Sequence, residues 1–369
     1  MNSMANMYDY LTWRGDLQFD RDPVHDPDML IFAALSYTDL PELESNAMTI
    51  HEVHRRYVEE KIQQSQLIFD PAKLLQLCAE SHRYRNVVVE HCRSTLDHDQ
   101  VMQFCAMSFR YDNHKVVIAY RGTDTTLTGW QEDLYFAAID ETSAQGEAIK
   151  FMNDFYTGTQ DEILVTGHSK GGNLAQYASI KANDDIRERI KGIWSMDGPG
   201  FKEHLIQSNA FQQMKDKMHR VVPEQSFVGM LMDNPVQPII CKSDAFFMGQ
   251  HMPDTWQILG PGFERASQLS NFSQFVWRTV DKWLENMTDE EKLHFTDNVF
   301  ALLSSGGAQT LDDMVDNPFK NSKSIISMFV HSDKQTQQRL GEVIGKLLNA
   351  SGDTLKGSVF KDRKNTQDR

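Results

Sequence analysis

The chain has 369 residues, of which 40% are hydrophobic and 10% aromatic, so it is long enough for one large catalytic domain with extra elements or for two ordinary domains. This composition excludes wholesale disorder, a collagen-like chain and a disulfide scaffold. The formal net charge of −15 argues against broad nucleic-acid binding and against electrostatic docking on anionic lipid.

Cysteine usage and the N-terminal sequence indicate the compartment. The four cysteines are scattered and form no Cys-x-x-Cys pair, so they suggest neither a zinc ribbon nor a disulfide framework. The N-terminus lacks the basic and apolar regions of a signal peptide, and no apolar run approaches the roughly 18 residues that span a bilayer. We expect a soluble cytoplasmic protein without a transmembrane segment, open to transient membrane contact.

Residues 1–100 show several helix starts. Asp-Pro pairs at 26–27 and 70–71 each place a capping side chain before a proline at the first helical position. Thr49 and Glu52 have the spacing of a capping box. The pattern predicts a helical N-terminal segment that packs on the core.

From about Val101 the sequence changes to short apolar runs. Residues 101–111 and 114–120 look like the two arms of an antiparallel hairpin. Further runs, separated by stretches that can each hold a helix, lie at 162–166, 190–196, 218–222 and 238–242. This alternation favours a mostly parallel sheet covered by helices, and we assign residues 101–265 to an α/β core.

Beyond about Gly262 the strand signals fade. Capping-box pairs recur at 288/291 and 332/335, and apolar residues between 340 and 348 follow helical spacing. We expect a helical C-terminal region over residues 266–350, as a lid or an appendage, and a flexible tail over 351–369.

The strongest motif is Gly167-His168-Ser169-Lys170-Gly171, which lies between an apolar strand and a helix-compatible segment. In this context G-x-S-x-G forms a nucleophile elbow, in which the serine sits on a strained turn with its hydroxyl exposed. The glycines let strand and helix approach closely. The pattern predicts Ser169 as a nucleophile; the alternative is a structural glycine-rich turn or a decayed site.

An oxyanion hole needs two preorganised N–H donors. Lys170, directly after the candidate nucleophile, supplies the first. The second comes from the turn after the strand ending at Tyr120, where Thr123 also offers a hydroxyl. The alternative for this Arg-Gly-Thr stretch is a plain turn.

These motifs resemble a known family. Val117 to Thr123 (VIAYRGT), Gly129 to Leu134 (GWQEDL) and the GHSKGG stretch resemble the corresponding segments of class 3 lipases, over about Val101 to Trp256. The whole chain looks still more like a group of lipase-like bacterial proteins (Mbeg1-like, DUF2974), in which GHSKGGN, Asp-Gly-Pro-Gly-Phe and a late Gln-His-x-x-x-x-Trp recur. The resemblance implies an α/β-hydrolase fold.

In that fold the triad order is serine, acid, histidine, so the base follows Ser169. The histidines after it are His204, His219, His251, His294 and His331. His251 follows the last predicted strand through a loop, and the resemblance also puts the base there. His219 lies at a strand start and therefore at the opposite edge of the sheet, whereas His294 and His331 lie in helical context.

The acid departs from the lipase pattern. Class 3 lipases carry an aspartate just after the strand that matches Met218 to Val222, and here Ser226 falls closest to that position. Two replacements remain: Asp197, which ends the preceding strand in a Gly-Pro turn, and Glu224, which ends the expected strand. We favour Asp197, whose alternative role is to cap its own turn. The acid would orient the His251 tautomer.

Lys170 is a second departure, because the lipase motif reads GHSLGG. A cation beside the nucleophile would favour acyl substrates that carry phosphate or carboxylate. The alternative is a side chain that snorkels to solvent.

The sequence therefore predicts a lipase-like serine hydrolase of carboxylic esters, lipid esters among them. Ser169 attacks the acyl carbonyl and His251 shuttles the proton, through an acyl-enzyme. No metal or cofactor is required, and the expected partner is a small-molecule or lipid ester substrate. Two rival interpretations are a catalytically silent member of the fold that binds a partner or lipid, and an acyltransferase or amidase that uses the same serine.

Overall fold

The computed structural model describes residues 5–38, 40, 47–60, 69–124, 126–271, 273–274, 278 and 287–304. Its contacts divide the chain into two units, Met1–Asp289 and Glu290–Arg369. The described part of the second unit belongs to α12 (Asp289–Ser304), which begins beside the capping-box pair at 288/291. The predicted pair at 332/335, the helix over 340–348 and the tail over 351–369 lie outside the described residues.

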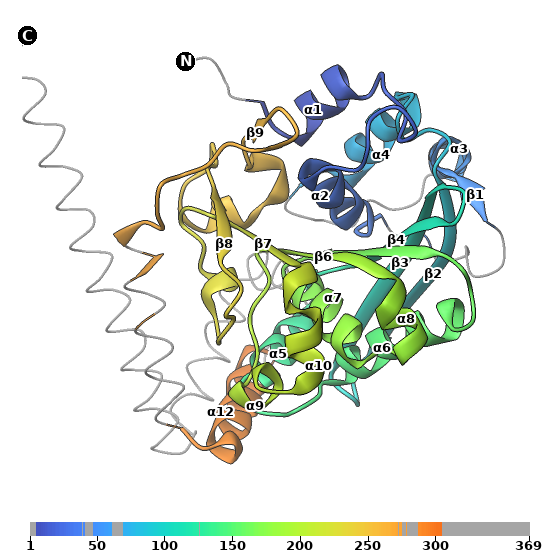
Figure 1. The fold of residues 1–369 in the computed structure, drawn as a ribbon. Helices are drawn as coiled ribbons and strands as arrows, with labels where there is room; N and C mark the ends of the chain where they lie inside the picture. Colours follow the sequence, from blue (N-terminus) through green and yellow to red (C-terminus); the bar gives the residue numbers. More distant parts are fainter. Residues whose placement is uncertain are drawn as a thin grey trace, which may run out of the picture. The chain divides into compact units, whose positions relative to one another are not determined.

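In the described residues of the first unit, eight strands form one sheet in the order of the chain (Figure 1). β1 to β4 pair antiparallel, and β4 to β8 pair parallel. The strands are β1 (Met48–Thr49), β2 (Val88–Asp97), β3 (Met102–Asp112), β4 (Lys115–Tyr120), β5 (Glu162–His168), β6 (Ile190–Met196), β7 (Met218–Pro223) and β8 (Pro238–Cys241). The sheet, with helices between its parallel strands, has the α/β-hydrolase architecture that the sequence predicts.

Helices cover both faces of this sheet. The apolar side chains of β4 alternate: Val117 and Ala119 face one hydrophobic cluster, whereas Val116 and Ile118 face another. The first cluster packs under α1 (Met7–Arg14), α2 (Asp26–Leu35), α3 (Ile50–Glu60) and α4 (Pro71–Glu80); the second packs under α6 (Ser143–Tyr156), α7 (Lys170–Lys181), α8 (Asp184–Arg189) and α10 (Asn209–Met214). In Figure 1 the blue N-terminal helices and the green helices accordingly lie on opposite sides of the strands.

The remaining described elements are short. They are α5 (Leu127–Tyr135), α9 (Glu203–Ile206), the 3-10 turns η1 (Lys215–Lys217), η2 (Val228–Met230), η3 (Phe247–His251) and η4 (Pro253–Thr255), and the strands β9 (Ile258–Leu259) and β10 (Gly262–Phe263). No described helix has the length and apolar character of a membrane span.

The predicted caps at Asp70 and Thr49 are confirmed, whereas the one at Asp26 is wrong by one residue. The Asp70 carboxylate accepts a hydrogen bond from the Lys73 N–H at 3.0 Å. Thr49 and Glu52 bond reciprocally, since each side chain accepts from the other residue's backbone N–H. At α2 the proline is in the first turn, but Asp26 is already helical and His25 is the cap.

Residues 88–97 differ from the helical segment expected before residue 101. They form β2, which pairs along its length with β3. The reason lies in Val88 and Val89, which open a β-branched run, and in the alternating burial that follows. Antiparallel pairing with β3 outweighs the weak local helix signals in this stretch.

Candidate active site

The elbow around Ser169 has the geometry that G-x-S-x-G requires. β5 ends at His168 and α7 begins at Lys170, so Ser169 is the single residue between strand and helix. Its φ of 59° and ψ of −131° are strained for a residue with a side chain. Its N–H donates to the Met196 carbonyl at 2.9 Å, which ties the turn to the end of β6.

The glycines of the motif are required by close backbone approach. A Cβ on Gly167 would lie 2.0 Å from the Gly171 carbonyl oxygen, and a Cβ on Gly171 would lie 2.0 Å from that of Tyr120. A Cβ on Gly122 would lie 2.9 Å from the Ser169 Cβ. The Arg-Gly-Thr turn therefore packs directly against the candidate nucleophile.

His251 and Asp197 are hydrogen-bonded to each other. Nδ1 of His251 lies 2.6 Å from Oδ2 of Asp197, although 54 residues separate them. Asp197 directly follows β6 and His251 ends η3, after β8, so both lie at the carboxyl edge of the parallel strands, where β5 delivers Ser169. The His251 ring lies 4.7 Å from the His168 ring, centroid to centroid, and is thus beside the elbow.

This contact fixes the polarity of the imidazole. A carboxylate only accepts, so Nδ1 carries the proton and Nε2 is left as the acceptor. Asp197 is fully buried at a φ of 53°, and its second oxygen accepts from the Ser226 hydroxyl at 2.5 Å and the Gly229 N–H at 3.1 Å. Three donors thus hold the carboxylate in one orientation.

Glu224 and Ser226 occupy the other positions considered for the acid. The described hydrogen bonds of Glu224 use its backbone: its N–H donates to the Cys241 carbonyl, and its own carbonyl accepts from Ser270. Ser226, which falls closest to the lipase aspartate in sequence, instead donates its hydroxyl to Asp197. The structure brings Asp197, not Glu224, to His251.

Among the other histidines, His219 stacks on Trp194 at the start of β7, with ring centroids 4.5 Å apart. This is the end of the strand opposite to the elbow. The His204 side chain in α9 is 58% exposed. His294 lies in α12, in the second unit, and His331 lies outside the described residues.

The two candidate oxyanion positions flank the elbow. Lys170 is the first residue of α7, and the first N–H groups of a helix have no intrahelical acceptor. The Thr123 hydroxyl donates to Oδ2 of Asp133 in α5 at 2.7 Å. This hydrogen bond fixes the rotamer of the threonine side chain. Burial raises the pKa of Asp133 to about 6, against the opposing effects of Lys170 and the Thr123 bond.

The Lys170 side chain follows neither course that the sequence suggested. It is 1% exposed, so it neither snorkels to solvent nor offers its charge to a substrate. Nζ lies 3.1 Å from Oε2 of Glu132, which is itself fully buried, and donates to the Gln103 carbonyl at 2.8 Å. Sequence reasoning missed this partner, because Glu132 lies 38 residues away in the chain. The adjacent Asp133 could have paired with Lys170 equally well on sequence grounds.

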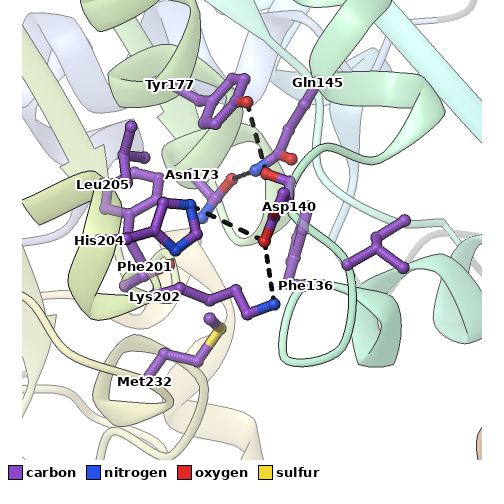
Figure 2. A pocket seen from close by; sticks show the side chains of 12 residues that line it. Phe136, Asp140, Gln145, Asn173, Tyr177, Phe201, Lys202, His204, Leu205 and Met232 are labelled. Atoms are coloured by element: carbon purple, nitrogen blue, oxygen red, sulfur yellow. Dashed lines mark hydrogen bonds and ion pairs between the residues drawn. The ribbon is translucent and has the colours of Figure 1, made fainter. Parts of the chain in front are cut away.

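A pocket lies beside the elbow helix (Figure 2). Its space, including the open mouth, is about 250 Å³. Asn173, one turn after the nucleophile in α7, accepts from the Gln145 amide at 2.8 Å and donates to the Gly200 carbonyl at 2.8 Å. Phe136 and Phe201 line it as well. No described cluster of His, Cys, Asp or Glu is arranged to hold a metal.

The mostly parallel sheet with helices on both faces places the chain among proteins of the α/β-hydrolase fold. A family model described as Mbeg1-like matches residues 78–301, and the chain belongs to this family. No curated protein sequence matches it.

Solved structures similar to this chain include several lipases. The M37 lipase is 16% identical, with 55% of this chain and 69% of that chain covered at a TM-score of 0.36. A fungal lipase–inhibitor complex is 17% identical, with coverages of 65% and 86% and a TM-score of 0.35. The Rhizomucor miehei lipase propeptide complex is 14% identical, with coverages of 72% and 78% and a TM-score of 0.36.

Proposed function

We propose that this protein hydrolyses carboxylic esters, lipid esters among them, through a triad of Ser169, His251 and Asp197. The observation that carries the proposal is the 2.6 Å contact between His251 and Asp197 at the sheet edge where the strained elbow presents Ser169. A buried carboxylate, an imidazole that this carboxylate orients and a serine on a sharp turn are the parts that nucleophilic acyl transfer needs.

In the proposed reaction, Nε2 of His251 takes the hydroxyl proton of Ser169 as its oxygen attacks the acyl carbonyl. The developing oxyanion accepts hydrogen bonds from the backbone N–H groups of Lys170 and Thr123. The protonated imidazole, stabilised by Asp197, then returns the proton to the leaving alcohol. Water hydrolyses the acyl-enzyme by the same steps, with His251 again as the base.

The test is labelling of the purified protein with a fluorophosphonate probe, together with hydrolysis of p-nitrophenyl esters of increasing acyl length. Ser169→Ala should abolish labelling and lower hydrolysis by about a thousandfold or more. Ser179→Ala is the matched control, since this buried serine lies in α7, the helix that follows Ser169, and donates to the Ala175 carbonyl. Labelling that survives Ser169→Ala, or is missing from the wild type, would overturn the proposal.

The same assay separates the two rival interpretations. A silent member of the fold would give no Ser169-dependent label. An acyltransferase would be labelled but would pass the acyl group to an added alcohol or amine faster than to water, which product analysis by mass spectrometry resolves.

A further inference from the structure

Two buried side chains that the triad does not use lie directly behind it. Tyr37 follows α2 in the N-terminal segment and is 3% exposed. His168 is the last residue of β5, next to the candidate nucleophile, and is also 3% exposed. Buried polar groups of this kind need partners, and theirs connect parts of the site that are far apart in sequence.

The side chains of Tyr37 and His168 contact each other and two further parts of the site. Oη of Tyr37 lies 3.0 Å from Nδ1 of His168, and Nε2 of His168 lies 2.7 Å from the carbonyl oxygen of His251. The Tyr37 hydroxyl also lies against Gly122, in the Arg-Gly-Thr turn, since a Cβ on Gly122 would lie 2.3 Å from Oη of Tyr37. The hydroxyl and the imidazole therefore join the oxyanion turn, the elbow and the His251 loop.

The direction of each bond follows from donor and acceptor chemistry. The His251 carbonyl only accepts, so Nε2 of His168 carries the proton. Burial, reinforced by the neighbouring His251, holds the pKa of His168 well below its usual range, so the ring is neutral and Nδ1 accepts from the Tyr37 O–H. The chain of hydrogen bonds therefore runs from Tyr37 to His168 to the His251 carbonyl, and its first member packs against Gly122.

We propose that Tyr37 and His168 are positioning residues for ester hydrolysis, which set the His251 loop and the Gly122 turn relative to Ser169. The inference rests on the proposed function. It is supported by the place of His251 at the end of the short 3-10 turn η3, where its backbone carbonyl accepts the bond from His168. A displacement of about 1 Å in a catalytic group costs on the order of a hundredfold in rate.

Tyr37→Phe is the first variant, because it removes one hydroxyl and no packing volume. Loss of a buried hydrogen bond that orders the site should lower kcat by about tenfold and leave KM nearly unchanged. Tyr120→Phe is the matched control: this tyrosine is equally buried, and its hydroxyl donates to the Ala148 carbonyl of α6, on the other face of the sheet. The control should keep wild-type kcat with a comparable change in melting temperature.

His168→Gln and His168→Leu form the second pair. The glutamine amide can still donate to the His251 carbonyl, whereas leucine cannot. The kcat of His168→Gln should therefore be higher than that of His168→Leu. A role in packing alone would not separate these two variants by kcat at matched melting temperature.

Fluorophosphonate labelling of each variant distinguishes this inference from the proposed function. If the wild type is labelled at Ser169 but Tyr37→Phe and His168→Leu hydrolyse esters as fast as Tyr120→Phe does, the positioning role is overturned and the function stands. If the wild type shows neither labelling nor hydrolysis, the proposed function fails, and the inference fails with it.

Discussion

Lys170 and Glu132 form an ion pair of 3.1 Å, and neither side chain is more than 1% exposed. Glu132 also accepts from the backbone N–H groups of Gln103 and Ala144, so its carboxylate is fully engaged. This pair fixes Lys170 to Glu132 of α5. Asp133, the residue after Glu132, accepts a hydrogen bond from the Thr123 hydroxyl. One network, fully buried at Lys170 and Glu132, thus spans both candidate oxyanion positions.

Breaking this pair should be costly, because it leaves one charge buried without its partner. Lys170→Met should lower the free energy of unfolding by about 3 kcal/mol or more, whereas the double variant Lys170→Met, Glu132→Gln should recover most of that loss. Urea denaturation measures both. Lys150→Met, at a lysine whose side chain is 61% exposed, should change stability by less than about 0.5 kcal/mol. Equal stability of the single and double variants would contradict the expectation.

The assignment of the acid predicts unequal effects at two carboxylates. Asp197→Asn should lower kcat by about a thousandfold or more, because the amide disturbs the His251 tautomer that the carboxylate fixes. Glu224→Gln should remain close to wild type, since the described hydrogen bonds of Glu224 use its backbone. Steady-state ester hydrolysis compares them, and the reverse order of effects would make Glu224 the acid.

Replacing two glycines by alanine should change stability in opposite directions. Gly171→Ala should prevent correct folding, because its Cβ would lie 2.0 Å from a backbone oxygen. Gly146→Ala, at the fourth residue of α6 with its nearest neighbour at 3.6 Å, should stabilise by about 0.5–1 kcal/mol, the cost of a helical glycine. Soluble yield and thermal melting measure the pair. A well-folded Gly171→Ala would show that the elbow is looser than described.

Asp133 predicts a pH dependence of stability. Burial raises its pKa to about 6, so between pH 4 and 6 the folded protein holds a proton that the unfolded chain has released. Asp133 therefore makes unfolding easier as pH rises through this window. The stability of Asp133→Asn relative to wild type should increase from about pH 4 to pH 6 and then level off.

Urea unfolding at several pH values measures that difference. Asp161→Asn should be less stable than the wild type over the same pH range. The reason is that a hydrogen bond from Arg110 lowers the pKa of Asp161, so its ionised form stabilises the fold. A flat difference for Asp133→Asn across pH 4 to 6 would exclude the raised pKa.

Local signals predicted much of the fold. The hairpin at 101–120 and the runs near 162, 190, 218 and 238 all became strands of one sheet, because buried parallel strands need continuous apolar residues. The caps at Asp70 and Thr49 also followed from residues three apart. β2 was missed, because its pairing with β3 outweighs a local pattern that is short and mixed in polarity.

The candidate site could be predicted only in part. Ser169 and the Arg-Gly-Thr turn were visible, because each is a contiguous motif with its own backbone geometry. The order of strands brought Asp197 and His251 forward as candidates, but the choice between Asp197 and Glu224 needed their positions in space. Tyr37 gave no local signal, since its partner His168 is 131 residues away.

The sequence by itself determined most of the strands, the elbow and its glycine requirement, because these depend on periodicity and on backbone sterics within a few residues. Only the tertiary structure decided which carboxylate meets His251, that Lys170 turns inward to Glu132 and that Tyr37 reaches the elbow. The physical reason is that hydrogen bonds and ion pairs between distant segments are set by how the chain packs, and packing depends on the whole core at once.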